Sequence, residues 1–226
     1  MAQSVIVTGG FGVLGQSVSQ AFAKRGDKVA RIDFAKAPHS AIAGALDIGG
    51  VDLTDEAATA AALETVVATH GGIDVLINIA GGFAWETLED GSLDTWARMH
   101  SMNVTTAATI TKLALGELKK GPHGRIVNIG AGGAVKADMG MGAYAASKAG
   151  VHRLTEALAT ELGGSSVTVN AILPSIIDTP TNRKDMPDSD PADWVKPESI
   201  AEVILFIASP ASGAVTGALI PATRNC

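Results

Sequence analysis

Cysteine is almost absent from this chain, whose 226 residues contain a single one, Cys226, at the last position. One cysteine cannot form an internal disulfide, and it cannot supply the several thiolates of a cysteine-based zinc site. The composition therefore gives no reason to expect an oxidising compartment, and we expect a cytoplasmic location.

Long apolar runs and an excess of positive charge are also missing. No stretch reaches the ~18 apolar residues of a membrane-spanning helix, and the start, MAQSVIVTGG, lacks the basic segment and long apolar stretch of a secretion signal. Lys and Arg total 17 against 23 Asp and Glu, which gives a net charge of -6, and the basic residues are scattered. Contacts with nucleic-acid phosphates need clustered basic side chains, so we predict neither a membrane nor a nucleic-acid partner.

The chain contains instead a regular alternation of two kinds of segment. Short apolar runs rich in β-branched residues predict strands, and longer segments rich in Ala, Leu, Glu and Lys predict helices. The strands are expected at residues 5–7, 29–32, 75–77, 126–129 and 167–169, and the helices at residues 13–25, 55–69, 93–120 and 143–162. Apolar strands joined by helical crossovers indicate a parallel sheet with helices on both faces. We predict an α/β fold: one doubly wound Rossmann domain over residues 1–226, with about seven strands, the last near residues 217–221.

One segment departs from this regularity. Residues 178–197, DTPTNRKDMPDSDPADWVKP, are polar, rich in proline and longer than an ordinary connection. Long connections in compact domains are usually either functional or disordered. We expect a substrate lid here, and a disordered surface loop is the alternative.

A glycine-rich turn follows the first predicted strand, with the sequence Thr8-Gly9-Gly10-Phe11-Gly12-Val13-Leu14-Gly15. A strand-to-helix turn that brings backbone N–H groups against a pyrophosphate has no room for side chains, and the helix that follows adds a positive dipole. The alternative, a plain tight turn, is disfavoured by the strand-turn-helix context. The residues expected to contact a dinucleotide are Gly9, Phe11, Gly12, Val13, Leu14 and Gly15.

An acidic residue stands where a ribose-binding carboxylate is expected. Asp33 ends the second predicted strand, eighteen residues beyond Gly15. A carboxylate there accepts hydrogen bonds from ribose hydroxyls and repels a 2′-phosphate, so we predict a preference for NAD(H). Arg31 and Lys36 lie nearby and keep NADP(H) open as the alternative cofactor.

Two further residues follow the third strand region. Asp52 and Leu53 are candidates for contact with the adenine edge. The alternative for Asp52 is an ordinary acidic residue near a helix start.

Tyr144 and Lys148 form the candidate catalytic pair. They lie four residues apart in a predicted helix, which puts them on one face. A phenol of pKa near 10 is a poor acid-base catalyst at neutral pH, and an adjacent ammonium group stabilises its phenolate. An unremarkable surface pair is the alternative.

Together these motifs resemble the short-chain dehydrogenase/reductase family, and the resemblance covers essentially the whole chain. It is carried by residues 8–15, Asp33, Asn78-Ile79-Ala80-Gly81, Asn103, Tyr144 to Lys148, and Asn170-Ala171-Ile172-Leu173-Pro174 followed by Thr179. The resemblance implies an NAD(P)-dependent oxidoreductase acting on a small molecule.

The same resemblance assigns roles to individual residues. It implies that Tyr144 donates the proton, that Lys148 binds the nicotinamide ribose and lowers the pKa of Tyr144, and that Asn103 holds a water of the proton relay. It further implies a group of residues on the adenosine and nicotinamide sides of the cofactor: Asn78, Ala80, Gly81, Pro174 and Thr179.

One position departs from the family pattern. The usual catalytic serine lies thirteen residues before the tyrosine, where this chain has Ala131. The quinonoid dihydropteridine reductase branch of the family also has alanine there, and residues 80–84, 139–144 and 173–187 are similar to that branch. This favours hydride transfer from NADH to a quinonoid dihydropterin-like ring. Asn103 belongs to the ordinary dehydrogenase pattern and keeps a carbonyl reductase or alcohol dehydrogenase open, and loss of the serine also allows a non-catalytic NAD(H)-binding redox sensor.

Other candidate residues and partners complete the expectations. The histidines lack metal-ligand spacing, so we predict no metal site and read them as structural or exposed; they are His39, His70, His100, His123 and His152. Phe83, Trp85 and Trp194 are candidates for an aromatic cover over a flat substrate, with core packing as the alternative. The helices at 93–120 and 143–162 resemble the pair used for dimer contacts in the family, which implies a homodimer or homotetramer.

Overall fold

The computed structural model describes residues 2–224 and contains one seven-stranded sheet in the order β3-β2-β1-β4-β5-β6-β7. The strands are β1 (Ser4–Thr8), β2 (Lys28–Asp33), β3 (Leu46–Gly49), β4 (Val75–Asn78), β5 (Arg125–Ile129), β6 (Thr168–Pro174) and β7 (Leu219–Ala222). Every neighbouring pair runs parallel. The predicted single-domain α/β fold with a doubly wound parallel sheet is therefore confirmed. Cys226 lies outside the described residues.

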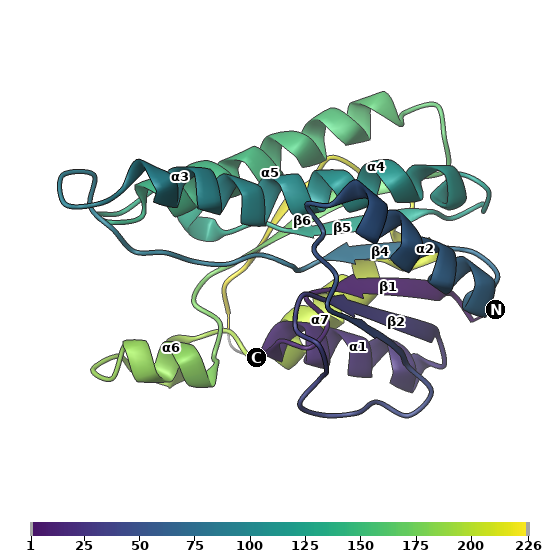
Figure 1. The fold of residues 1–226 in the computed structure, drawn as a ribbon, viewed down its shortest axis with the longest axis horizontal. Coiled ribbons are helices and arrows are strands. Elements are labelled where there is room, and N and C mark those ends of the chain that lie inside the picture. Colours follow the sequence, from purple (N-terminus) through teal and green to yellow (C-terminus); the bar gives the residue numbers. More distant parts are fainter. Residues whose placement is uncertain (1, 225–226) are drawn as a thin grey trace.

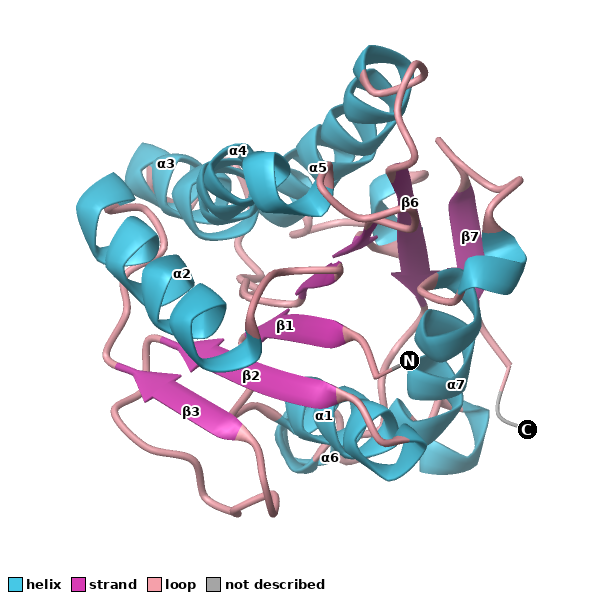
Figure 2. Ribbon diagram, turned by 90° about the vertical axis from the view of Figure 1, so that its right-hand side faces the viewer, coloured by secondary structure: helices cyan, strands magenta, loops and turns pink. Residues whose placement is uncertain are grey.

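Helices cover both faces of the sheet (Figure 2). They are α1 (Val13–Arg25), α2 (Glu56–His70), α3 (Leu93–His100), α4 (Thr106–Leu118), α5 (Gly142–Glu161), α6 (Pro180–Asp185) and α7 (Pro197–Ile207). Helices α2, α4 and α5 contribute to one buried apolar layer and α1 and α7 to the other. Strand β1 shows why both layers exist, because Ile6 packs into the first and its neighbours Val5 and Val7 into the second. A strand buried on both faces reads as a continuous apolar run, which is the pattern the sequence shows.

Local signals in the sequence set the helix ends. Gly26 follows α1 with φ +92°, and its N–H bonds back to the carbonyls of Phe22 and Ala23. Such a left-handed terminal residue favours glycine because it has no Cβ. At the other end of a helix, the Asp55 side chain accepts hydrogen bonds from Ala57 and Ala58 and caps α2.

The segment expected as one helix over residues 93–120 is interrupted. Between α3 and α4 lies a π-helical turn, Ser101–Thr105. A π turn inserts one extra residue into a helix and is frequent at functional sites, and its position is not visible in apolar periodicity. This turn places Asn103 in the interior, at 1% exposure.

Residues 178–197 include regular secondary structure, and their role as a substrate lid stays a prediction. They contain α6, a short 3-10 turn at Pro191–Asp193, and a parallel bridge between Val195 and Ile177. Helix α6 stands out from the body of the molecule (Figure 1). The helix that follows, α7, was not among the helices predicted from the sequence.

The strand order creates a crevice. The chain after β1 goes to β2 on one side, and β4 later pairs with β1 on the other. The connections leaving β1 and β4 thus turn in opposite directions at the carboxyl ends of the strands, the place where doubly wound folds bind ligands. Within residues 2–224, no helix is both long and apolar enough to cross a membrane.

Candidate active site

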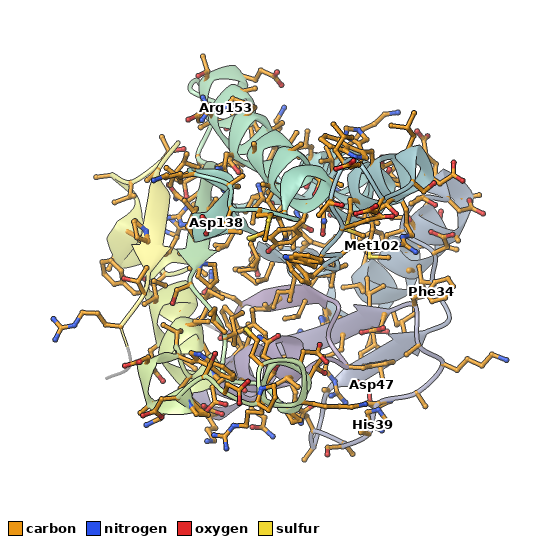
Figure 3. The ribbon with its side chains drawn as sticks, turned by 90° about the vertical axis from the view of Figure 1, so that its left-hand side faces the viewer. Phe34, His39, Asp47, Met102, Asp138 and Arg153 are labelled. Carbon is orange, nitrogen blue, oxygen red and sulfur yellow. The ribbon has the colours of Figure 1, made fainter. Side chains whose placement is uncertain are left out.

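A cleft of about 890 Å3 opens at the carboxyl ends of β1, β2 and β4. Its walls bring together most of the residues expected to contact a dinucleotide: Gly9, Phe11, Gly12, Val13, Leu14, Gly15, Asp33, Asp52, Leu53, Ala80, Gly81 and Thr179. Phe34 and Met102 also line it, Phe34 after β2 and Met102 in the π turn (Figure 3). Neither was expected from the sequence, because each is an isolated apolar residue without a motif.

The glycine turn is packed too closely for side chains. Gly9 has φ +62°, and a Cβ at Gly15 would collide with the Gly9 carbonyl. Gly10 was not among the residues expected from the sequence to contact the cofactor, and a Cβ there would lie 2.7 Å from the Cβ of Arg31. The turn therefore passes directly over β2, and the backbone of the turn is accessible from the cleft.

The start of α1 fits an anionic group. Gly12 precedes the helix without any side-chain cap, and the first turn contains no acidic residue. Gly12, Val13, Leu14 and Gly15 all line the cleft. The first N–H groups of a helix have no partner within the helix and carry partial positive charge, so these residues fit the pyrophosphate of a dinucleotide.

Asp33 connects the glycine turn to the same cleft. Its Oδ2 accepts a hydrogen bond from the Phe11 N–H at 3.0 Å, and its Oδ1 accepts one from the Ala35 N–H at 2.9 Å. Each carboxylate oxygen can accept more than one hydrogen bond. The carboxylate therefore retains acceptor capacity toward the cleft while being held in place by two backbone groups.

Arg31 does not offer a site for a 2′-phosphate. Its side chain is fully buried and makes a bidentate pair with Asp47, at 2.6 and 2.7 Å, and a third hydrogen bond to Gln16. The guanidinium lies 5.3 Å from the centre of the Phe11 ring. Arg31 thus packs beneath the glycine turn as a structural residue. Of the two basic residues considered for binding a 2′-phosphate, this leaves only Lys36, which is exposed.

Four expected cofactor residues do not line the cleft: Tyr144 and Lys148, described below, and Asn78 and Pro174. Asn78 is buried at the end of β4, where its Nδ2 donates to Thr111 and Asn128. Pro174 is buried as the last residue of β6. The Asn78 amide ties β4 to α4 and β5 and so supports the central strand, and a role of Asn78 on the adenosine side of the cofactor stays a prediction.

Tyr144 and Lys148 occupy the first turns of α5, on one face as expected. The Lys148 Nζ donates to the Ile129 carbonyl at 2.8 Å. The Tyr144 ring meets the Phe83 ring edge-on, with 4.8 Å between the ring centres. Lys148 lies next to the cleft, since its Nζ is 3.5 Å from the position of a Cβ at Gly81, a residue of the cleft wall.

The electrostatics of this pair differ from the expectation. Burial raises the pKa of Tyr144 to about 12 and lowers the pKa of Lys148 to about 8. Burial thus outweighs any lowering of the tyrosine pKa by Lys148 in this arrangement, and the lowering itself stays a prediction. Desolvation disfavours both charged forms, and the Lys148 ammonium is directed to a backbone carbonyl.

Asn103 holds the protein backbone. Its Oδ1 accepts from the Gly82 N–H at 2.9 Å, and its Nδ2 donates to the Gly82 carbonyl at 3.1 Å and to the Ser147 Oγ at 2.9 Å. The Ser147 hydroxyl in turn donates to the Tyr144 carbonyl. Ser147 was not assigned a role from the sequence, and here it links the π turn to the helix that carries Tyr144.

The aromatic cover is reduced to two of its three members. Phe83 and Trp85 have 59% and 57% of their surface exposed, near Tyr144 and Gly140 respectively. Trp194 is 3% exposed, so placing it over a substrate is wrong and the alternative of core packing holds for it. In the described part of the chain, no cluster of His, Cys, Asp or Glu side chains is arranged to hold a metal ion.

Comparison with known proteins agrees with this geometry. Residues 3–190 match the family model for short-chain dehydrogenases, and the chain belongs to the short-chain dehydrogenase/reductase family. It is 31% identical to a 3-oxoacyl-(acyl-carrier-protein) reductase of Thermotoga maritima, over 95% of this chain and 94% of that protein. It is 32% identical to the acetoacetyl-CoA reductase of Shinella zoogloeoides, with 98% and 97% covered.

Solved structures show the same fold. The ligand-free aldohexose dehydrogenase of Thermoplasma acidophilum superposes with a TM-score of 0.89 at 26% identity, covering 97% of this chain and 92% of that one. A 3-ketoacyl-(acyl-carrier-protein) reductase of Brucella melitensis, solved with NADH, gives 0.86 at 26% identity, with 97% and 96% covered. This chain is accordingly an NAD(P)-dependent oxidoreductase.

Proposed function

We propose that this chain is a reductase that takes hydride from NADH and protonates its substrate from Tyr144. The observation that carries the proposal is the placement of Tyr144 and Lys148 on one face of α5, with Lys148 against Gly81 in the wall of the dinucleotide cleft. The reduced nicotinamide supplies the hydride.

The residues of the chain have distinct tasks in this reaction. Burial raises the pKa of Tyr144 to about 12, so its phenol is protonated at neutral pH but is a weak acid, and proton donation depends on nearby positive charge that stabilises the phenolate. Lys148 binds the ribose next to the nicotinamide and supplies positive charge when the phenolate forms. Asn103 and Ser147 hold the Gly82 backbone and the first turn of α5 at a fixed separation.

The preference for NADH over NADPH rests on Asp33. Its carboxylate is anchored by the Phe11 and Ala35 N–H groups at the edge of the cleft, where it meets the adenosine ribose. A 2′-phosphate would be repelled there. Arg31, the nearest basic residue in the sequence, is committed to Asp47.

For the substrate we propose a planar conjugated ring of the quinonoid dihydropterin kind. Ala131 is 5% exposed and supplies no hydroxyl to a substrate oxygen, while Phe83 exposes its ring beside Tyr144 and Trp85 exposes its ring near Gly140. An electron-poor conjugated ring needs less oxyanion stabilisation than a ketone does, so the missing hydroxyl is tolerated. Residues 178–197, which contribute Thr179 and Thr181 to the cleft wall, would close over such a ring.

A small ketone or aldehyde is the second candidate, and the names of the relatives favour it. They include reductases of 3-oxoacyl and acetoacetyl compounds and a meso-2,3-butanediol dehydrogenase of Serratia marcescens, 30% identical over 96% of this chain and 91% of that protein. A non-catalytic redox sensor is the candidate outside the enzymes, and such a protein would bind NADH without oxidising it.

The variant Ala131→Ser separates the two substrate classes. If the ring is the natural acceptor, the wild-type protein oxidises NADH faster with freshly generated quinonoid dihydropterin than with ketones, and the added hydroxyl raises only the ketone rate. Ketone turnover that exceeds pterin turnover in the wild type would reject the ring and support the carbonyl candidate.

We also propose a homodimer or homotetramer formed through α3, α4 and α5. Helices α3 and α5 already pack against each other within the chain. Sedimentation of the purified protein tests this, and a monomer at micromolar concentration would contradict it.

A further inference from the structure

His152 is a buried titratable side chain that the proposed chemistry does not use. It lies on α5, one helical turn beyond Lys148 and two turns beyond Tyr144, so the three side chains follow one face of the helix. The residue is 3% exposed. Its position next to the catalytic pair allows it to affect the geometry of that pair.

The Nε2 of His152 accepts a hydrogen bond from the Ala131 N–H at 3.3 Å. A backbone N–H can only donate, so Nε2 carries no proton and the ring proton lies on Nδ1. This bond therefore requires the neutral imidazole.

Gly130, the residue before Ala131, packs closely against the His152 ring. A Cβ at Gly130 would lie 2.5 Å from Nε2 and 2.7 Å from Cδ2 of His152, so glycine is required there. One residue earlier, the Ile129 carbonyl accepts the hydrogen bond from Lys148. Helix α5 thus contacts three consecutive residues at the end of β5. Lys148 bonds to Ile129, and His152 packs against Gly130 and accepts from Ala131.

We propose that His152 is a positioning residue, which as acceptor for the Ala131 N–H fixes residues 129–131 and keeps the Ile129 carbonyl on Lys148. When this bond is lost, the segment moves away from α5 and Lys148 loses its partner. The effect on turnover rests on the reductase function proposed above, and the effect on the backbone does not.

The charges around His152 determine when the bond exists. Burial and the positive charges of Arg153 and Lys148 lower the pKa of His152, and Glu156 raises it. These three groups lie on α5, and Arg153, labelled in Figure 3, pairs with Glu156 at 2.8 Å. The segment against the ring offers Gly130 and Ala131, with Leu173 of β6 behind Gly130, and none of them is charged. The bond is intact at neutral pH and is lost on acidification.

A matched pair of variants isolates the acceptor. In His152→Gln the amide oxygen reaches the place of Nε2 and does not titrate, whereas His152→Leu fills the space without an acceptor. At pH 7.5 we expect the Leu variant to lose about tenfold to a hundredfold in kcat, as displaced catalytic groups do. The Gln variant should recover most of that loss. Wild-type kcat should fall as the pH drops below the ordinary histidine pKa of about 6.5, and the Gln variant should lack this fall.

Amide NMR tests the backbone part without any substrate. The Ala131 N–H signal of the wild type should follow the titration of His152, and amide exchange at residues 129–131 should be faster in the Leu variant than in the Gln variant at equal pH. An Ala131 signal that ignores the titration, or equal exchange in both variants, would overturn the proposal. If the backbone behaves as expected while no acceptor is turned over, the reductase function fails and the positioning role stands. If the Leu variant does not fold, the comparison of wild type with the Gln variant still decides.

Discussion

At the scale of single residues, burial controls the two groups that define the site. Tyr144 and Lys148 are both taken out of water, so each is driven toward its neutral form. A neutral phenol is the form that a proton donor needs. A positive charge on the buried Lys148 is costly, so this residue lowers the stability of the folded protein at any pH at which it is protonated.

Removing the phenol hydroxyl tests the proton donor. We expect Tyr144→Phe to lower kcat for reduction by at least about a hundredfold, because a positioned general acid contributes on that order. The ring still packs on Phe83, so NADH binding measured by fluorescence titration should stay within about twofold of the wild type. Full turnover by this variant would remove Tyr144 from the acid role.

Replacing Lys148 tests the effect of its burial on folding. The folded pKa of about 8 lies below the ordinary 10.5, so between these values the unfolded chain binds more protons than the folded one. Wild-type stability therefore gains about 1.4 kcal/mol per pH unit from this residue as pH rises from 8 toward 10.5, a total of about 3 kcal/mol. Below pH 8 the full penalty for burying the charge is present.

Urea unfolding of the wild type and Lys148→Met, without cofactor, measures this gain. Tyr144 is present in both proteins, so its own titration cancels in the difference. We expect the Met variant to lose its advantage over the wild type steadily above pH 8. Stability profiles that stay parallel from pH 7 to pH 10 would show that Lys148 is not desolvated.

At the scale of elements, the glycine turn depends on β2 and β3 beneath it. Arg31 of β2 is fully buried, and its charge is compensated by Asp47 of β3 through two hydrogen bonds. The same arginine packs near Phe11 and against Gly10 of the turn. The position of the turn therefore relies on an ion pair from outside it.

Removal of the carboxylate partner should be costly. Asp47→Ala leaves a buried guanidinium without its counter-charge, and we expect a loss of about 3 kcal/mol in the free energy of unfolding by urea. The matched control is Glu56→Ala, which breaks a pair with Lys112 whose two side chains are 63% and 68% exposed. That change should cost less than about 1 kcal/mol. Equal losses in the two variants would refute the support role of Arg31.

The carboxylate at the end of β2 should set the cofactor preference. Asp33→Asn removes the charge that repels a 2′-phosphate, so we expect the ratio of kcat/KM with NADH to that with NADPH to fall at least about tenfold. Lys36→Ala serves as the control. If Lys36 binds a 2′-phosphate, this variant should have a lower kcat/KM with NADPH than the wild type, and otherwise its kcat/KM should be unchanged. An unchanged ratio in Asp33→Asn would contradict the assignment.

Elements with strong local signals were predictable, and those determined by packing were not. Helix α1 has the predicted bounds, because a glycine-rich turn and Gly26 enclose it. The π turn at 101–105 was missed because one inserted residue leaves the apolar pattern nearly unchanged. Trp194 was placed over the substrate because its polar surroundings in the sequence gave no sign that it folds back to 3% exposure.

At the scale of the whole molecule, the parallel sheet explains why distant motifs form one site. The glycine turn, Asp33 and Ala80-Gly81 follow three different strands, and the carboxyl ends of parallel strands meet at one edge. That gathering was predictable from strand order alone. The partners of buried side chains were not predictable, and only the structure shows that Arg31 pairs with Asp47 and that Asn78 bonds to Thr111.

The most direct test is the rate at which the purified protein consumes NADH and, in parallel, NADPH, with quinonoid dihydropterin and with a panel of ketones and aldehydes. The fold, the cleft and the pair Tyr144 and Lys148 predict rapid turnover of at least one acceptor, with NADH preferred over NADPH. Tight binding of NADH without turnover of any acceptor would contradict the account and indicate a redox sensor. Turnover that prefers NADPH would contradict the role given to Asp33.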